Sequence, residues 1–160
     1  KLVIAGATSD TDGYVKMLKE MAGDDPNIIF TGFVSGKLLE EIYSNAYVYV
    51  LPSKLEGMPL SLLEAMSYGN CGIGADIAEI ADVVEDKAIL FKKANVEDLK
   101  EKLQMVCDDV ELVEKYKNEA SGYICGKYNW EDVVNRTVEV YRGKKSCKEK
   151  LVENSSVASI

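Results

Sequence analysis

Short apolar runs alternate with helical patterns along most of this sequence, and that alternation constrains the fold more than any other feature. The runs have the length and composition of β-strands and lie at residues 2–5, 27–31, 46–51, 71–75 and 88–91. The fourth run contains two glycines, which weaken its strand propensity. Strands that are separated by helices indicate a parallel, doubly wound sheet with helices on both faces, so the sequence predicts an α/β fold. A short continuous apolar run such as residues 2–5 is typical of a strand buried on both faces.

Apolar residues at helical spacing predict the elements between and after these strands. Helices are expected at residues 14–22, 35–42, 59–68, 80–85, 96–107, 112–122 and 130–142. We therefore assign residues 1–142 to one domain and residues 143–160 to a polar tail. The first strand begins almost at residue 1, which leads us to expect a piece of a longer protein.

The composition excludes several kinds of function. The chain has 160 residues, a net charge of −8 and no histidine. The lack of histidine excludes Ser-His-Asp and Cys-His catalysis within the chain and most zinc sites. An acidic domain is also unsuited to nucleic acid, which requires clustered Lys and Arg. The four cysteines form no CxxC pair, and we expect free thiols in a reducing, cytoplasmic setting.

The loop between the third strand and the next helix offers a seat for an anion. Ligands of such sheets bind beyond the carboxyl ends of the strands, where this loop lies. The N–H groups of Leu60 and Ser61 fall in the first turn of the helix, where they lack intrahelical partners and lie at the positive end of the helix dipole. Pro59 has no N–H, so Gly57 and Met58 would supply further donors.

Two carboxylates flank this seat. Glu56 lies on the loop and Glu64 lies more than one turn into the helix. Carboxylates repel phosphate but accept paired hydrogen bonds from neighbouring hydroxyl groups. The pattern therefore favours a ligand that carries sugar hydroxyls as well as phosphate.

These residues belong to a longer motif. The segment Pro52 to Met66 resembles the signature P-S-x-x-E-G-x-x-L-x-x-L-E-A-M of family-4-type glycosyltransferases (glycosyl transferases group 1), which have the two-domain GT-B fold. In the same order, Gly32-Phe33-Val34 is similar to the family's G-F-V loop, residues 46–52 to its A-D-V-F-V-L-P strand, and residues 129–131 to the opening of its late helix. The resemblance covers nearly the whole chain, up to Arg142.

The resemblance implies a Rossmann-like domain, the C-terminal half of a GT-B fold, which binds the nucleotide-sugar donor. It implies that Glu64 holds the ribose hydroxyls and that Glu56 contacts the transferred sugar, as the catalytic candidate. The backbone from Gly57 to Ser61 would meet the sugar and the diphosphate, and main-chain groups near Phe33 and Val34 would meet the base. Such enzymes retain the anomeric configuration.

The resemblance also implies partners. The donor is a nucleotide-diphosphate sugar, and neither a metal nor another cofactor is expected. The acceptor is a glycan or a lipid-linked molecule, bound by an N-terminal domain that this sequence lacks together with its first strand. Peripheral association of the full-length protein with a membrane and a role in building a surface polysaccharide are compatible with the family. The isolated chain is predicted to be inactive.

The sequence departs from the family in two places. The Arg and Lys that clamp the diphosphate have no counterpart here, and the loop at residues 69–82 lacks the family's prolines and paired glycines. Glu79 adds bulk and negative charge where the family has glycine. Two alternative functions remain open from the sequence: a non-catalytic module that binds nucleotides or phosphosugars, and a GT-B-like sugar-nucleotide epimerase.

Overall fold

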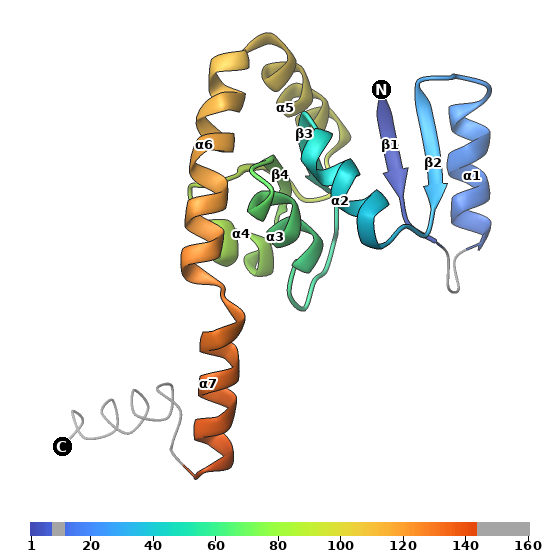
Figure 1. Ribbon diagram of the computed structural model, residues 1–160. Coiled ribbons are helices and arrows are strands. Elements are labelled where there is room, and N and C mark those ends of the chain that lie inside the picture. Colours follow the sequence, from blue (N-terminus) through green and yellow to red (C-terminus); the bar gives the residue numbers. More distant parts are fainter. Residues whose placement is uncertain (8–11, 144–160) are drawn as a thin grey trace, which may run out of the picture. The chain divides into compact units, whose positions relative to one another are not determined.

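A computed structural model describes residues 1–7 and 12–143 (Figure 1). Strands and helices alternate as predicted, and all strand pairs are parallel. Residues 144–160, most of the predicted polar tail, lie outside the described residues. The elements are β1 (Leu2–Ala5), α1 (Asp12–Ala22), β2 (Ile28–Gly32), α2 (Gly36–Asn45), β3 (Val48–Leu51), α3 (Leu60–Ser67), β4 (Cys71–Asp76), α4 (Ala78–Val84), β5 (Ile89–Lys92), α5 (Val96–Asp108), α6 (Val110–Lys127) and α7 (Trp130–Tyr141).

The chain divides into two compact units, and the first comprises residues 1–47. Its sheet is the parallel pair β1-β2, in which Leu2 lies opposite Ile28. The prediction that β1 is buried on both faces is wrong, because Leu2 and Val3 are 54% and 42% exposed. In the described part of the chain β1 has one strand neighbour, so its side chains have few atoms to pack against.

The second unit begins at Val48 and contains the hydrophobic core. Its sheet has the order β3-β4-β5, with Val50 opposite Ile73 and Ile73 opposite Ile89. The helices α3 and α4 pack against β4, α5 packs against β5, and the long α6 packs against α3 and β4. The fully buried side chains at the centre come from α3, β4, α4, α5 and α6: Leu62, Met66, Ile73, Ile80, Val84, Val106 and Val113.

The central strand β4 contains the two glycines that weaken its propensity. A Cβ atom at Gly72 would lie 2.9 Å from Leu62 Cδ1, and one at Gly74 would lie 2.7 Å from Ile80 Cγ2. Both distances are shorter than a carbon–carbon contact allows. The glycines are therefore explained by the close approach of α3 and α4, and tertiary packing compensates for the low propensity of the strand.

The last three helices begin at side-chain caps. The side chains of Asn95, Asp109 and Asn129 each accept a hydrogen bond from the N–H three residues further along. The helix α7 has no buried residue, and Trp130 in its first turn is 80% exposed. None of the described helices is both long enough and apolar enough to cross a bilayer.

Candidate functional site

The predicted site residues from Glu56 to Glu64 lie on one loop and the helix that follows it. The strand β3 ends at Leu51, just before Pro52, which cannot donate to a strand neighbour. Pro59 is buried and is the N-cap residue of α3. The helix itself begins at Leu60, whereas the sequence predicted that Pro59 would be its first residue. The helix ends before Gly69, whose φ of +78° is a left-handed conformation that glycine adopts without strain.

The first turn of α3 offers an anion fewer free N–H donors than predicted. The N–H of Leu60 lacks an intrahelical partner, as predicted, but it donates to the Met58 carbonyl of the loop over 2.8 Å. The loop turns back on itself just before the helix, which explains this bond. The Ser61 N–H has no backbone acceptor among the described residues. The seat therefore centres on Ser61.

A comparison of two helix N-termini indicates where an anion is best placed. The first turn of α3 contains no acidic residue, whereas the first turn of α4 contains Glu79, and Asp76 lies exposed just before α4. A carboxylate in the first turn already satisfies the positive end of a helix dipole. Phosphate is therefore favoured at α3 over α4.

The charges of both predicted carboxylates act on one phenol, that of Tyr49 on β3. Glu56 is half-buried on the loop, and Glu64 lies on the exposed side of α3. Burial raises the pKa of Tyr49 on β3, a hydrogen bond with the Ser61 hydroxyl lowers it, and the charges of Glu56 and Glu64 each raise it further. Ser61 thus contacts Tyr49, and Glu56 and Glu64 both act on the same phenol through their charge.

The sequence analysis missed Tyr49, which it treated only as part of a β-prone run. A signal was present, however. A tyrosine in a short strand of Val and Leu needs a partner for its hydroxyl group when it is buried. The polar residues nearest to the end of that strand are the ones that the motif supplies.

The remaining predicted donor contacts lie in the first unit. Phe33 and Val34 follow β2, where the Phe33 side chain is 77% exposed and Val34 is half-buried. They stand on the loop before α2, as the motif predicts. Their predicted contact with a nucleotide base stays a prediction.

Other reactive groups do not form a second site. Burial raises the pKa of the Cys71 thiol to about 11, which leaves it protonated at neutral pH. Cys71, Cys107 and Cys125 are free, as predicted, and Cys147 lies outside the described residues. Among the described residues, no group of three or more His, Cys, Asp or Glu side chains could hold a metal ion.

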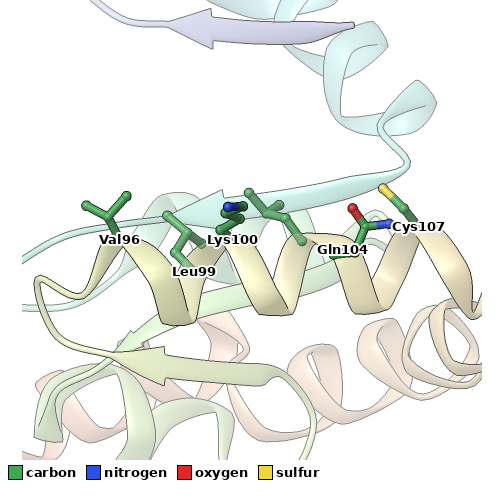
Figure 2. A pocket seen from close by; sticks show the side chains of 6 residues that line it. Val96, Leu99, Lys100, Gln104 and Cys107 are labelled. Carbon is green, nitrogen blue, oxygen red and sulfur yellow. The ribbon is translucent and has the colours of Figure 1, made fainter.

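A shallow hollow of about 300 Å³ lies along one face of α5 (Figure 2). Its lining comes from residues spaced three or four apart on that helix: Val96, Leu99, Lys100, Leu103, Gln104 and Cys107. None of the predicted site residues lines it. It offers an apolar helix face without a carboxylate, so it does not fit the chemistry of a sugar nucleotide.

The family is decided by the match of residues 1–123 to the family described as glycosyl transferases group 1. The chain belongs to this family. A relative of this chain, the uncharacterized glycosyltransferase MJ1607 of Methanocaldococcus jannaschii, is 30% identical over 144 residues, which are 89% of this chain and 37% of the relative. Sulfoquinovosyl transferase SQD2 of Arabidopsis thaliana is 35% identical over 107 residues, which are 64% of this chain and 21% of that protein.

Solved structures show the same fold for this group 1 chain. Alr3699/HepE of Anabaena, in complex with UDP and glucose, aligns over 88% of this chain and 40% of its own, with a TM-score of 0.81 and 16% identity. The predicted fold class, the Rossmann-like half of a GT-B glycosyltransferase, is confirmed. The chain spans less than half the length of each of these proteins.

Proposed function

We propose that this chain is the donor-binding domain of a retaining glycosyltransferase. The full-length enzyme would move a hexosyl group from a nucleotide-diphosphate sugar to a glycan or a lipid-linked acceptor. The observation that carries the proposal is that Glu56, Ser61 and Glu64 lie on the loop and helix that follow β3, where the Ser61 hydroxyl contacts Tyr49 and both carboxylates act on its phenol through their charge. The Alr3699/HepE structure, which contains UDP and glucose, supports this class of donor.

Each residue has a distinct task in this proposal. The Ser61 N–H and the N-terminus of α3 receive the diphosphate. Glu64 accepts hydrogen bonds from the ribose hydroxyls, and Glu56 accepts them from the sugar that is transferred. Main-chain groups near Phe33 and Val34 meet the base.

The reaction exchanges one bond at the anomeric carbon for another. The bond from that carbon to the diphosphate oxygen breaks, and a bond to the acceptor oxygen forms on the same face of the sugar. The acceptor proton passes to the departing diphosphate, so the step needs no histidine. In this proposal the helix N-terminus balances part of the diphosphate charge, and no metal takes part.

A binding measurement tests the site. Calorimetry and ligand-observed NMR would measure the affinities of UDP, GDP, ADP and their sugars for the full-length protein. Glu64→Gln weakens two charge-assisted hydrogen bonds, each worth about 1.5–3 kcal/mol in gross terms. We expect the affinity for the nucleotide to fall about tenfold to a hundredfold, with little change in folding.

The matched control is Glu101→Gln, which changes an exposed carboxylate on α5 that lies outside the site. It should leave the affinity unchanged. If wild type and the Glu64 variant bind the nucleotide with equal affinity, Glu64 is an exposed acidic residue without a role in binding. If wild type binds none of the nucleotides at millimolar concentration, the proposed function is wrong.

The proposal also predicts that this chain by itself transfers no sugar. The reaction of GT-B enzymes takes place between two domains, and this chain spans only 37% of its relative MJ1607. Incubation of the purified chain with UDP-, GDP- and ADP-sugars, followed by chromatography of the products, measures this directly. Detectable transfer would contradict the prediction.

A further inference from the structure

Tyr49 reaches from the sheet to the first turn of α3. In the parallel pair β3-β4 it lies opposite Gly72. A Cβ atom at Gly72 would meet Leu62 Cδ1 at 2.9 Å, so this face of the sheet is the one that α3 covers. Residues that are paired across parallel strands point to the same face. The Tyr49 side chain therefore lies beside α3, where its hydroxyl is hydrogen-bonded to that of Ser61.

The start of α3 lacks the usual local restraint. Its N-cap is Pro59, which makes no side-chain hydrogen bond to the helix. Asn95, Asp109 and Asn129 supply such bonds at the starts of α5, α6 and α7. A missing side-chain cap leaves the first turn less well fixed. The Tyr49–Ser61 bond supplies a restraint from outside the helix, at the residue whose N–H is directed to the anion seat.

The two carboxylates of the site also influence the phenol of Tyr49. Burial raises the pKa of the phenol, and the charges of Glu56 and Glu64 raise it further. The hydroxyl therefore stays protonated and neutral at physiological pH. A neutral phenol adds nothing to the repulsion between these two carboxylates and a phosphate.

We propose that Tyr49 is a positioning residue of the donor site, which holds the first turn of α3 in the orientation that binds a nucleotide sugar. It acts through Ser61 and needs no contact with the ligand. Phenylalanine at position 49 would fill the same space between sheet and helix, so the packing does not require the hydroxyl. This inference rests on the proposed function, because it assigns a role toward the same ligand.

A double-mutant cycle on the full-length protein tests this role. The variants are Tyr49→Phe, Ser61→Ala and the two together, and the probes are UDP-glucose, GDP-mannose and ADP-glucose in calorimetry. We expect each single variant to raise the Kd of the probe that wild type binds best about threefold to tenfold. The double variant should be no weaker than either single variant, because both remove the same hydrogen bond. The midpoint of thermal unfolding should change little.

The control for the cycle is Tyr141→Phe on α7, where the side chain is 86% exposed. It should leave the Kd of that probe unchanged. Binding by wild type together with unchanged Kd values for Tyr49→Phe and Ser61→Ala would overturn the role of Tyr49 while leaving the proposed function in place. Additive losses would overturn the coupling through Ser61. Binding of no probe by wild type would contradict the proposed function and, with it, the role of Tyr49 toward a donor.

A second measurement tests the arrangement without a ligand. NMR of tyrosines labelled with ¹³C at the ring carbon follows the ionisation of Tyr49, whose signal is assigned by its loss in Tyr49→Phe. Ser61→Ala should raise the pKa of Tyr49, and Glu56→Gln and Glu64→Gln should each lower it. A Tyr49 pKa that none of the three variants moves would overturn the arrangement whatever the binding results.

Discussion

Glu56 and Glu64 both act on Tyr49 through their charge but meet different parts of the proposed donor. Glu64 lies on the helix and would hold the ribose, whose contacts stay nearly constant during transfer. Glu56 lies on the loop and would face the sugar, where charge develops at the anomeric carbon. Only contacts that tighten in the transition state accelerate the chemical step.

This difference predicts opposite kinetic effects for two matched variants. Glu56→Gln should lower kcat more than it raises KM, and Glu64→Gln should raise KM more than it lowers kcat. UDP, GDP or ADP without a sugar should bind the Glu56 variant as tightly as wild type. Steady-state kinetics of the full-length protein and calorimetry with the nucleotide test this. Loss of nucleotide affinity with an unchanged kcat in the Glu56 variant would mean that the two roles are reversed.

A second prediction at the residue scale concerns Gly74 in β4. Alanine there would place its Cβ 2.7 Å from Ile80 Cγ2, a methyl group fixed close to the backbone of a fully buried residue. Overpacking of this kind costs about 1–3 kcal/mol, and the gain in strand propensity offsets roughly 0.5–1 kcal/mol of it. We expect Gly74→Ala to lower the free energy of unfolding in urea.

Gly122→Ala is the control for this prediction. Gly122 lies inside α6, and a Cβ there would meet no atom within 4 Å. Alanine should stabilise the helix by about 1 kcal/mol. If Gly74→Ala is stabilising as well, β4 must move away from α4 more easily than its burial implies.

At the scale of elements, a polar cluster joins the C-terminal ends of α4 and α6. The Lys127 ammonium donates to the Glu85 carboxylate over 2.6 Å and to the Tyr123 hydroxyl over 2.7 Å. It also lies 5.3 Å from the centroid of the Tyr128 ring. The Tyr123 hydroxyl donates to the Val83 carbonyl over 3.0 Å. Glu85 follows α4 with a φ of +51°, so the cluster holds in place a residue with a strained backbone.

The ion pair predicts how the stability of this connection depends on pH. The hydrogen bond and charge of Lys127 lower the pKa of Glu85, whose ordinary value is 4.5. Those of Glu85 raise the pKa of Lys127 above its ordinary value of 10.5. The stabilisation is therefore complete between pH 4.5 and 10.5. It is lost as the pH falls through the lowered pKa of Glu85 or rises through the raised pKa of Lys127.

We expect Lys127→Met to lower the urea midpoint at neutral pH, and this difference from wild type should shrink on acidification below pH 4.5. The effect should be small and should weaken with salt, since both side chains of the pair are partly exposed. Lys100→Met is the control, because its pair with Glu97 on α5 is more exposed and spans 3.7 Å. A difference that persists undiminished in acid would assign the effect to packing of the lysine stem.

At the scale of the whole molecule, the buried side chains are distributed unevenly between the two units. Tyr43 is the one buried residue of the described first unit, whereas the core cluster belongs entirely to the second. Opening free energies follow local burial. We expect amide hydrogens of β4 and β5 to exchange much more slowly than those of β1 and β2. Hydrogen exchange followed by NMR measures this, and equal protection in both sheets would mean that the units open together.

The sequence by itself determined the order and type of the elements and the position of the loop before α3. The strands at residues 2–5 and 71–75 and the helix ending before Gly69 all follow from patterns within a few neighbouring residues. The Glu56 and Glu64 motif is equally local, and it was sufficient to predict the family.

Tertiary packing decided the features that depend on residues far apart in the chain. It made Gly72 and Gly74 necessary to a strand that is buried from Cys71 to Ala75 and whose propensity alone is weak. It also placed the Tyr49 hydroxyl against Ser61, within the influence of the Glu56 and Glu64 charges. Periodicity and capping report only which face a residue occupies and where a helix begins. The distance between a strand and the helix above it is set by how their side chains interlock, and no local pattern contains that information.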